Sequence, residues 1–342
     1  MATMNDVAKA AGVSTSTVSY VLSGKRTISP ETKSQVLAAI DKLGYSPHAG
    51  ARALASNRSN VLGLVVPLRE DVNVSVVMQF VAAVVTTARN FQQDVLLLTQ
   101  DDLGGIERVT SQSVVDGLVM MDIVARDPRI PLLAKMNKPA VLIGVPDDAH
   151  GLSCIDFDFA AASRISVRHL VDLGHRRIAL IGSPQASLER HATYADRVRS
   201  GFEEASRTAG VEFSSRACEA NPTALAEALR ELVTGPQGAT GLVVHNEALM
   251  PLMRDTLAEM QLRIPEDVSV VAIAPTDVAV SSTVPWTAVS IPAHDIGRTA
   301  VEMVMERMHE QRAAEVRLVV PALVQRSTTV AAPGSSKSGP VH

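Results

Sequence analysis

The chain has 342 residues, of which 46% are hydrophobic and 20% charged, enough for two or three globular domains. Its two cysteines, Cys154 and Cys218, do not have metal-ligand spacing, and we expect both to be small buried thiols. Because there is no signal-peptide pattern and no run of 18 apolar residues, we expect a cytoplasmic protein without a membrane span.

Charge is distributed unevenly along the chain. Residues 1–60 contain seven Lys or Arg and three Asp or Glu, a net charge of +4, so the total of −4 leaves −8 for residues 61–342. A basic segment joined to an acidic body is typical of a small nucleic-acid-binding module attached to another domain. On charge alone, a chance excess of a few basic residues stays open as the alternative.

Two short helices are predicted at the N-terminus. The sequence Thr3-Met-Asn-Asp6 has the pattern of a capping box, and the glycine at position 12 supplies the left-handed cap that ends the first helix. Ser14 then caps a second helix from residue 15 to about residue 22. Because only three residues separate the two helices, they must cross steeply, as in a helix-turn-helix unit.

The second helix has two different faces. Val18, Val21 and Leu22 share one face and should pack inward. The opposite face is short and rich in hydroxyl groups, and it consists of Thr15, Ser16, Ser19 and Tyr20. A face of this kind fits the major groove of DNA, where hydroxyls can reach phosphates and base edges.

A third helix is predicted to begin at Ser29-Pro30 and to end at Gly44, with Val36, Ile40 and Leu43 as its apolar stripe. Three such helices form one compact headpiece. The Ala-rich segment 48–58 can form a further helix, but it is too short to be stable without support.

These residues resemble the headpiece and hinge of the lactose-repressor (LacI/GalR) family. The resemblance follows the order Asp6-Val-Ala-Lys-Ala-Ala-Gly-Val-Ser14, Thr17-Val-Ser19, Val21-Leu-Ser-Gly24, Leu43-Gly-Tyr-Ser-Pro47 and Ala51-Arg-Ala-Leu54. It implies a helix-turn-helix headpiece at 1–46 and a hinge helix at 47–59.

The same resemblance implies which residues contact DNA. Thr15, Ser16 and Tyr20 occupy the base-reading positions, and Leu54 matches the hinge leucine that wedges into the minor groove and bends the duplex. The complete set of expected DNA contacts is Thr3, Asn5, Ser14, Thr15, Ser16, Thr17, Ser19, Tyr20, Lys25, His48, Arg52, Leu54, Ala55 and Arg58.

The body alternates apolar strands with helices, which predicts an α/β fold with parallel sheets and two such units. The predicted strands are 61–66, 95–98, 118–121, 140–143, 178–181, 242–244 and 268–273, and the predicted helices include 76–89, 161–173, 195–209, 224–233 and 249–260. Gly104-Gly105 is interpreted as a turn, and no strand is followed by a Gly-rich phosphate loop, so neither a nucleotide nor another cofactor is expected.

The body also resembles the sensor of the same family, which has the fold of periplasmic sugar-binding proteins. The resemblance is clearest in His169-Leu-Val-Asp-Leu-Gly-His-Arg-Arg-Ile-Ala-Leu-Ile-Gly182, in Gly201-Phe202, and in the segments 264–271 and 321–328. It implies an effector-binding and dimerisation domain of two subdomains at 60–330. We expect the Ser/Gly/Pro-rich tail at 331–342 to be disordered.

In this fold a ligand lies between the two subdomains, at the carboxyl ends of the strands. The expected effector contacts are Asp122, Asp158, Arg197, Asn246 and Trp286, with Arg199 as an alternative to Arg197. Asp158 and Asn246 could instead cap helices, and Trp286 could simply pack. His175 is expected to fix a loop. The pair Met78-Gln79 could face either the dimer contact or the cleft.

One stretch departs from the family pattern. Ala272-Ile-Ala-Pro275 stands where the family commonly has Gly-Tyr-Asp-Asp, and Ile291-Pro-Ala293 is apolar where ligand contacts can fall. We therefore expect a less polar, reshaped or unused pocket.

The sequence thus predicts a homodimeric transcription repressor of carbohydrate-related genes that binds a palindromic operator and responds to a sugar or a related metabolite. A free-standing solute-binding protein is opposed by the headpiece and by the missing signal peptide. An enzyme is opposed by the lack of a nucleophile elbow, a metal-ligand cluster or a carboxylate pair.

Overall fold

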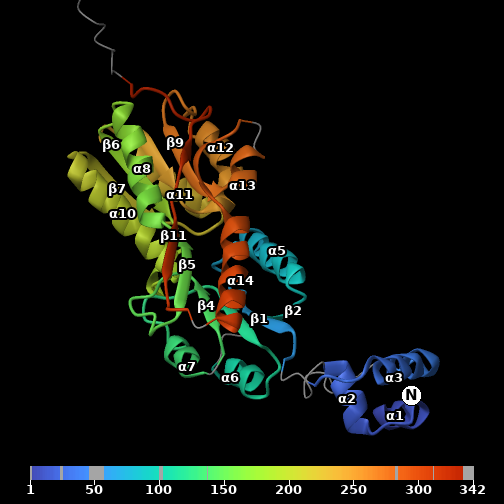
Figure 1. Ribbon diagram of the computed structural model, residues 1–342. Coiled ribbons are helices and arrows are strands. Elements are labelled where there is room, and N and C mark those ends of the chain that lie inside the picture. Colours follow the sequence, from blue (N-terminus) through green and yellow to red (C-terminus); the bar gives the residue numbers. More distant parts are fainter. Residues whose placement is uncertain are drawn as a thin grey trace, which may run out of the picture.

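The computed structural model consists of a small helical headpiece and a larger α/β body made of two subdomains (Figure 1). It describes residues 2–333, with the exception of 24–25, 46–57, 100–102, 137, 282–283 and 311. Within these described residues, no helix is long and apolar enough to cross a membrane.

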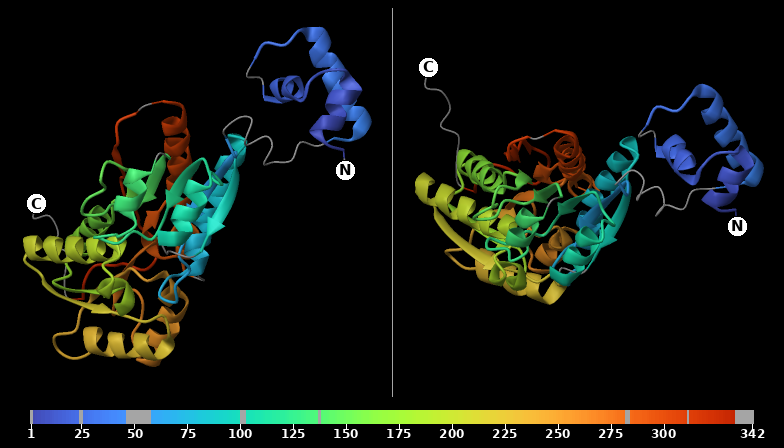
Figure 2. Two further views of the ribbon diagram at one scale, coloured as in Figure 1. Left: turned by 90° about the horizontal axis from the view of Figure 1, so that it is seen from below. Right: turned by 60° about the horizontal axis from the view of Figure 1, so that its bottom comes forward.

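The headpiece contains α1 (Met4–Ala11), α2 (Thr15–Ser23) and α3 (Pro30–Leu43), which form a body of their own (Figure 2). The predicted caps are confirmed. The Asp6 amide donates to the Thr3 hydroxyl, and the Thr3 amide donates back to the Asp6 carboxylate. Gly12 ends α1 with a φ of +67°, a conformation that costs glycine nothing.

The headpiece core is small. Its buried members are Val7, Ala8, Val18, Val36, Ala39 and Tyr45. Val21 and Leu22 pack against this core as predicted, but the prediction for Leu43 was wrong, because its side chain is 37% exposed. The other two helices of the headpiece do not cover the last turn of α3. At that end the buried side chain is that of Tyr45, which follows the helix.

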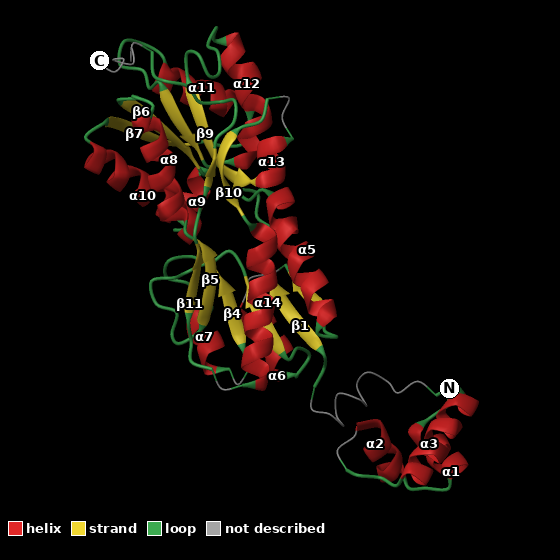
Figure 3. Cartoon of the chain, turned by 45° about the horizontal axis from the view of Figure 1, so that its top comes forward, coloured by secondary structure: helices red, strands yellow, loops and turns green. Residues whose placement is uncertain are grey.

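The first subdomain is built on a parallel sheet of six strands. Their order across the sheet is β11 (Val316–Val319), β5 (Ser153–Phe157), β4 (Ala140–Ile143), β3 (Gly117–Met120), β1 (Val61–Val65) and β2 (Asp94–Leu98). One face packs against α5 (Val74–Asn90) and α14 (Ala293–His309), which lie side by side, and the other against α6 (Leu103–Ser111) and α7 (Ile130–Lys135) (Figure 3).

The second subdomain repeats this arrangement. Its strand order is β12 (Leu323–Val324), β10 (Thr287–Ile291), β9 (Ser269–Pro275), β8 (Gly241–Val244), β6 (Arg177–Gly182) and β7 (Glu212–Ala217), with only the β10–β12 pair antiparallel among these described strands. One face is covered by α8 (Phe159–Asp172) and α10 (Thr193–Ala209), and the other by α11 (Pro222–Val233), α12 (Met250–Glu259) and α13 (Thr276–Val280).

Helices α8 and α10 touch at Gly201. A Cβ atom at this position would lie 2.6 Å from the carbonyl oxygen of Ala160, so a larger residue would push the helices apart. This close contact explains why the predicted Gly201-Phe202 motif has a glycine in the middle of a helix, where glycine is otherwise unfavourable.

The chain passes between the two subdomains three times. It crosses from β5 to α8, returns from β10 to α14, and crosses again from β11 to β12. Each subdomain therefore combines segments that are far apart in the sequence. As a result, relative movement of the subdomains must be taken up at these three crossings.

The structure extends and corrects the predicted elements. The strands and helices predicted for the headpiece and the body occur, with ends that differ by a few residues, while the predicted hinge helix falls mostly outside the described residues. The interpretation of Gly104-Gly105 as a turn was wrong, because both lie in the first turn of α6, which is fixed by the buried Ile106 and Val109. Both cysteines are buried as expected, and burial raises the pKa of each thiol to about 11.

Candidate functional site

The outer face of α2 presents a row of hydroxyl groups. Thr15 and Ser16 are exposed, Ser19 and Tyr20 are half-buried, and Val18 on the opposite face is fully buried. Helical periodicity places Ser16, Ser19 and Tyr20 on one surface, as expected for residues i, i+3 and i+4. The headpiece therefore offers a narrow polar helix surface of the shape that a major groove accepts.

Some predicted contact residues also hold the headpiece together. The Ser14 hydroxyl accepts a hydrogen bond from the Thr17 amide at 3.1 Å and shares another with the Thr17 hydroxyl at 2.9 Å. Thr3 forms the capping box of α1, and the bond that its hydroxyl donates lowers the pKa of the Asp6 carboxyl. Asn5 is exposed on the first turn of α1.

A positive charge lies beside Tyr20. The guanidinium carbon of the exposed Arg26 is 5.9 Å from the centre of the Tyr20 ring, within the range of a cation–π contact. Arg26 was counted among the basic residues of the headpiece but was not predicted as a DNA contact. Its contact with Tyr20 places its positive charge next to a side chain that was predicted to contact DNA.

The remaining predicted DNA contacts are Lys25, which follows α2, and residues of the hinge. Arg58 is exposed just before β1. The others are Lys25, His48, Arg52, Leu54 and Ala55, and all five lie outside the described residues. The hinge helix and the leucine wedge therefore stay predictions.

A cleft lies between the two subdomains, at the carboxyl ends of strands from both sheets. From the first subdomain it is lined by residues after β1, β3 and β4, and from the second by residues after β6, β7 and β8. Its interior has room for about 210 Å³. The cleft lies where the predicted fold expects a ligand.

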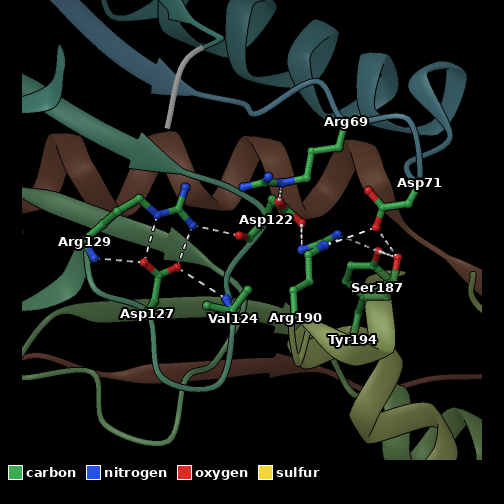
Figure 4. A network of polar contacts seen from close by, with 9 residues as sticks. All are labelled: Arg69, Asp71, Asp122, Val124, Asp127, Arg129, Ser187, Arg190 and Tyr194. Carbon is green, nitrogen blue, oxygen red and sulfur yellow. Dashed lines mark hydrogen bonds and ion pairs between the residues drawn. The ribbon is translucent and has the colours of Figure 1, made fainter. Parts of the chain in front are cut away.

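Arg190 connects the two subdomains at the margin of this cleft (Figure 4). It follows α9 (Gln185–Glu189) in the second subdomain, and its Nη1 is 2.7 Å from Asp122 Oδ1 while its Nε is 3.1 Å from Asp71 Oδ2. Both carboxylates belong to the first subdomain. The Ser187 hydroxyl donates to Asp71 at 2.6 Å, and Arg69 donates to the other oxygen of Asp122 at 2.9 Å.

This network favours the charged forms of its members. Burial opposes ionisation of Asp71, but the Ser187 hydrogen bond and the Arg190 guanidinium outweigh it and lower the pKa of the carboxyl. Burial likewise opposes the charge on Arg190, but Asp122, Tyr194 and Asp71 together raise its pKa. Burial raises the pKa of the neighbouring Tyr194 phenol to about 12, so this hydroxyl stays neutral.

A second ion pair fixes the loop that carries Asp122. Arg129 donates from Nε to Asp127 Oδ1 at 2.8 Å and from Nη2 to the carbonyl oxygen of Asp122 at 2.7 Å (Figure 4). The Asp127 carboxylate also accepts from the Val124 amide. These contacts hold Asp122 at a φ of +55°, a left-handed conformation that an aspartate tolerates better than most residues.

The other wall of the cleft holds buried polar groups of altered acidity. Burial lowers the pKa of His245 to about 4, so its imidazole is neutral, and burial raises the pKa of Glu247 to about 7. Asn246 donates from its amide to the Cys218 carbonyl at 2.8 Å. On the wall formed by the first subdomain, burial raises the pKa of Asp156 on β5 to about 7, although the nearby Arg197 opposes this shift.

The structure brings only part of the predicted effector set to the cleft. Of the five residues, Asp122 and Asn246 line it in the described part of the chain. Asp158 instead accepts from the Ala161 amide at 2.9 Å and caps α8, which was its alternative interpretation. Asn246 makes no capping hydrogen bond, so its alternative was wrong.

Arg197 and Trp286 are not among the described residues that line the cleft. On α10 the neighbouring Val198 is 1% exposed in the core, while Arg197 is half-buried and attracts the carboxylate of Asp156, which belongs to the lining. Trp286 is 1% exposed in the core of the second subdomain, among the side chains on the α11–α12 side of the sheet. Arg199, the alternative arginine, pairs with Asp196 on the surface.

Sequence reasoning missed Arg190, Asp71, Asp156 and His245. Arg190 and Asp71 are separated by 119 residues and pair only when the subdomains fold together. A usable signal existed for Asp156, because a carboxylate inside the apolar strand Ser153–Phe157 is unusual. His175 behaves as expected and bonds to Thr240 at 2.9 Å and to the Val330 carbonyl at 3.2 Å, which joins loop and tail segments.

A helix-turn-helix headpiece joined to a two-subdomain body with a cleft defines a class of DNA-binding regulators. Comparison with known proteins agrees. Residues 3–48 match the model of bacterial regulatory proteins of the lacI family, and residues 167–329 match the periplasmic binding protein-like domain.

Relatives with the same organisation match nearly the whole chain. The HTH-type transcriptional repressor PurR of Photobacterium profundum is 28% identical over 96% of this chain and 98% of its own length. A transcriptional regulator CelR–cellobiose complex is 25% identical, with a TM-score of 0.66 over 96% of this chain and 100% of that one. The lac repressor dimer bound to operator and the anti-inducer ONPF shares the fold, with 24% identity and a TM-score of 0.81 over 96% and 99%.

The chain carries the DNA-binding domain of the lacI family of bacterial regulatory proteins and a periplasmic binding protein-like domain, and relatives that match nearly its whole length are transcriptional regulators. It is a DNA-binding transcription regulator with a LacI-type headpiece and a periplasmic-binding-protein-like body. The matched relatives are named as regulators, which agrees with the prediction of a regulator rather than an enzyme.

Proposed function

We propose that this regulator is a cytoplasmic homodimeric repressor that binds an inverted-repeat operator through α2 and responds to a small molecule held in the interdomain cleft. The observation that carries the proposal is the hydroxyl-rich outer face of α2 on a compact headpiece. An unbiased selection of random duplexes with the full-length protein tests it. An enriched inverted repeat is expected, and a pool without any enriched motif would overturn the proposal.

Tyr20 is proposed to read a base edge. Replacing Tyr20 by Ala should relax the preference at one position in each half-site, at a cost of about 1–3 kcal/mol on the best operator, because a base contact discriminates by roughly that much. Repeating the selection with the variant measures this. Gln35→Ala on the exposed surface of α3 is the control. An equal loss of affinity on all sequences would instead assign Tyr20 to the DNA backbone.

The hinge is proposed to act together with α2. In this proposal the segment 47–59 becomes helical on DNA, Leu54 wedges into the minor groove, and Arg52, Arg58 and His48 lie along the phosphates. The support is the resemblance of the hinge sequence to the family, together with the exposed position of Arg58 before β1.

The outer surface of α5 is proposed as the dimer contact. Val74, Met78 and Val85 are 47%, 43% and 39% exposed and follow one another at helical spacing. An apolar stripe of this kind on a soluble protein is typical of an interface. The neighbouring Gln79 points elsewhere and donates to Asp277 across the subdomains at 3.0 Å. Neither Met78 nor Gln79 is among the described residues that line the cleft, and the dimer contact of Met78 stays a proposal.

Met78→Asp is expected to convert the dimer to a monomer at micromolar concentration, because the substitution places a charge inside the proposed contact. Sedimentation or light scattering measures the mass. Val320→Asp is the control, since Val320 is 84% exposed on the loop between β11 and β12. A variant of unchanged mass would place the interface on another surface.

The cleft is proposed as the control site. Arg190 links the subdomains through Asp71 and Asp122, so a molecule that enters between them changes the free-energy difference between open and closed forms. A ligand can shift the DNA-binding equilibrium only by its difference in affinity for the two forms.

A further inference from the structure

The lining of the cleft is strongly acidic. Within the described residues it contains six carboxylates and neither lysine nor arginine, and the carboxylates are Glu70, Asp71, Asp122, Asp156, Glu219 and Glu247. At its margin, Arg69 and Arg190 compensate Asp122 and Asp71 (Figure 4). No lysine or arginine occurs in the sequence of the short body segments that the structure does not describe, which are residues 100–102, 137, 282–283 and 311.

The histidine in the lining does not offset this charge. His245 is 4% exposed, and burial lowers the pKa of its imidazole to about 4, which leaves it neutral at physiological pH. Four carboxylates of the lining, Glu70, Asp156, Glu219 and Glu247, have no basic side chain bonded to them in the described structure. Burial raises the pKa of Asp156 and Glu247 to about 7, so a cation bound beside them would favour their charged forms.

Asp156 has a buried oxygen without a partner. The residue is 5% exposed, and its Oδ1 accepts from the Phe157 amide at 2.9 Å, while no described group bonds to Oδ2. Arg197 attracts this carboxylate from α10 but makes no hydrogen bond to it among the described residues, and Asp158 from the start of α8 repels it. An unpaired buried acceptor is costly, so an N–H donor in the cleft would be stabilised there.

Aromatic rings stand beside these acids. Phe159, Tyr194 and His245 form a cluster with ring centroids 5.4 to 6.1 Å apart, and all three line the cleft. Much of the remaining lining is aliphatic, with Val76, Ile143 and Ile291 among its members. Aromatic faces next to carboxylates favour organic cations, because the ring quadrupole and the carboxylates attract the same charge.

We propose that the cleft recognises a protonated amine carried on a small, largely apolar body, with Asp156 as the buried acceptor for one of its N–H groups. This inference rests on the proposed function, in which the cleft is the effector site. An anion would be repelled by the lining. A neutral polyol would leave the acidic charge uncompensated.

Matched pairs of small molecules test the proposal by calorimetry on the full chain. The pairs are phenethylamine with 2-phenylethanol, putrescine with 1,4-butanediol, and glucosamine with glucose. In at least one pair the amine should bind at least about tenfold more tightly than its neutral partner. The pair in which the amine binds more tightly shows whether the ligand's apolar part is aromatic, aliphatic or a sugar. Equal binding within every pair, or no binding by any amine, would overturn the proposal.

Asp156→Asn should abolish most of the preference for the amine, whereas Asp172→Asn on the exposed end of α8 should not change it. A melting curve of each variant shows whether it is folded. If Asp156→Asn is folded and keeps the full preference, the assignment of Asp156 is refuted. Operator selection uses no ligand, so a protein that selects an inverted repeat but binds no amine would refute this inference and leave the proposed function intact.

Discussion

Arg190→Ala is expected to lower the free energy of unfolding of the body by about 3 kcal/mol. The substitution leaves Asp71 and Asp122, whose side chains are 11% and 9% exposed, without their shared counter-ion. Removing one partner of a buried ion pair costs roughly 3–5 kcal/mol, because the remaining charge stays desolvated. Arg69 still binds Asp122, which places the expected loss at the lower end of that range. Urea unfolding measures it.

The matched control is Arg263→Ala. Arg263 pairs with Asp267 on the surface with a side chain that is 69% exposed, and solvent screening leaves such pairs a small contribution to stability. Adding Asp71→Asn to Arg190→Ala should recover part of the stability, since the unpaired charge is then removed. If Arg190→Ala costs no more than Arg263→Ala, the network does not join the subdomains in the way described here.

Asp156→Asn is expected to stabilise the protein more at pH 8 than at pH 5. Burial raises the pKa of Asp156 to about 7 in the folded state, against a usual value near 3.8. A raised carboxyl pKa means that its contribution to stability is complete below pH 4 and is lost as the pH rises toward 7. Asparagine does not ionise and avoids this loss, so its advantage should grow by roughly 2–3 kcal/mol between pH 5 and pH 8.

Unfolding curves of the two proteins at both pH values give this difference. Arg197, Asp158 and the Cys154 thiol face the same carboxyl and are present in both proteins, so their own effects largely cancel in the comparison. Asp172→Asn on the surface should change stability by less than about 0.5 kcal/mol at either pH. A constant difference between Asp156→Asn and the unmodified chain would mean that Asp156 is ionised in the folded protein throughout.

The headpiece was predictable because its signals are local. Thr3, Gly12, Ser29 and Gly44 act within one helical turn, and the structure places caps at all four. The predicted burial of Leu43 was wrong for a reason that helical periodicity cannot show. Leu43 lies on the apolar stripe of α3, but the core of the three-helix headpiece ends before this residue.

The cleft was predictable in position but not in chemistry. Parallel strands bring their carboxyl ends together, and this rule located Asp122 and Asn246 correctly. It did not decide which residues of a helix beside the cleft enter the lining: on α10 these are Thr193 and Tyr194, and Arg197 is not among them. Arg190 contacts carboxylates 68 and 119 residues away, so its role depends on how the subdomains meet.

Several strands also lacked a local signal. β7 (Glu212–Ala217) is a mostly exposed edge strand, and β12 has only two residues, so neither shows the apolar run by which the central strands were recognised. The missed first turn of α6 contains two glycines, residues that weaken any helix prediction. Burial of Ile106 and Val109 against the sheet supplies the stability that the local sequence lacks.

The central claim is that two headpieces read a symmetric site in DNA. The most direct test measures the affinity of the full-length protein, at one salt concentration, for the selected inverted repeat and for a duplex of equal composition in which one half-site is reversed. We expect the inverted repeat to bind at least about a hundredfold more tightly, because reversal removes the base contacts of one headpiece. Equal affinities for the two duplexes would contradict the claim.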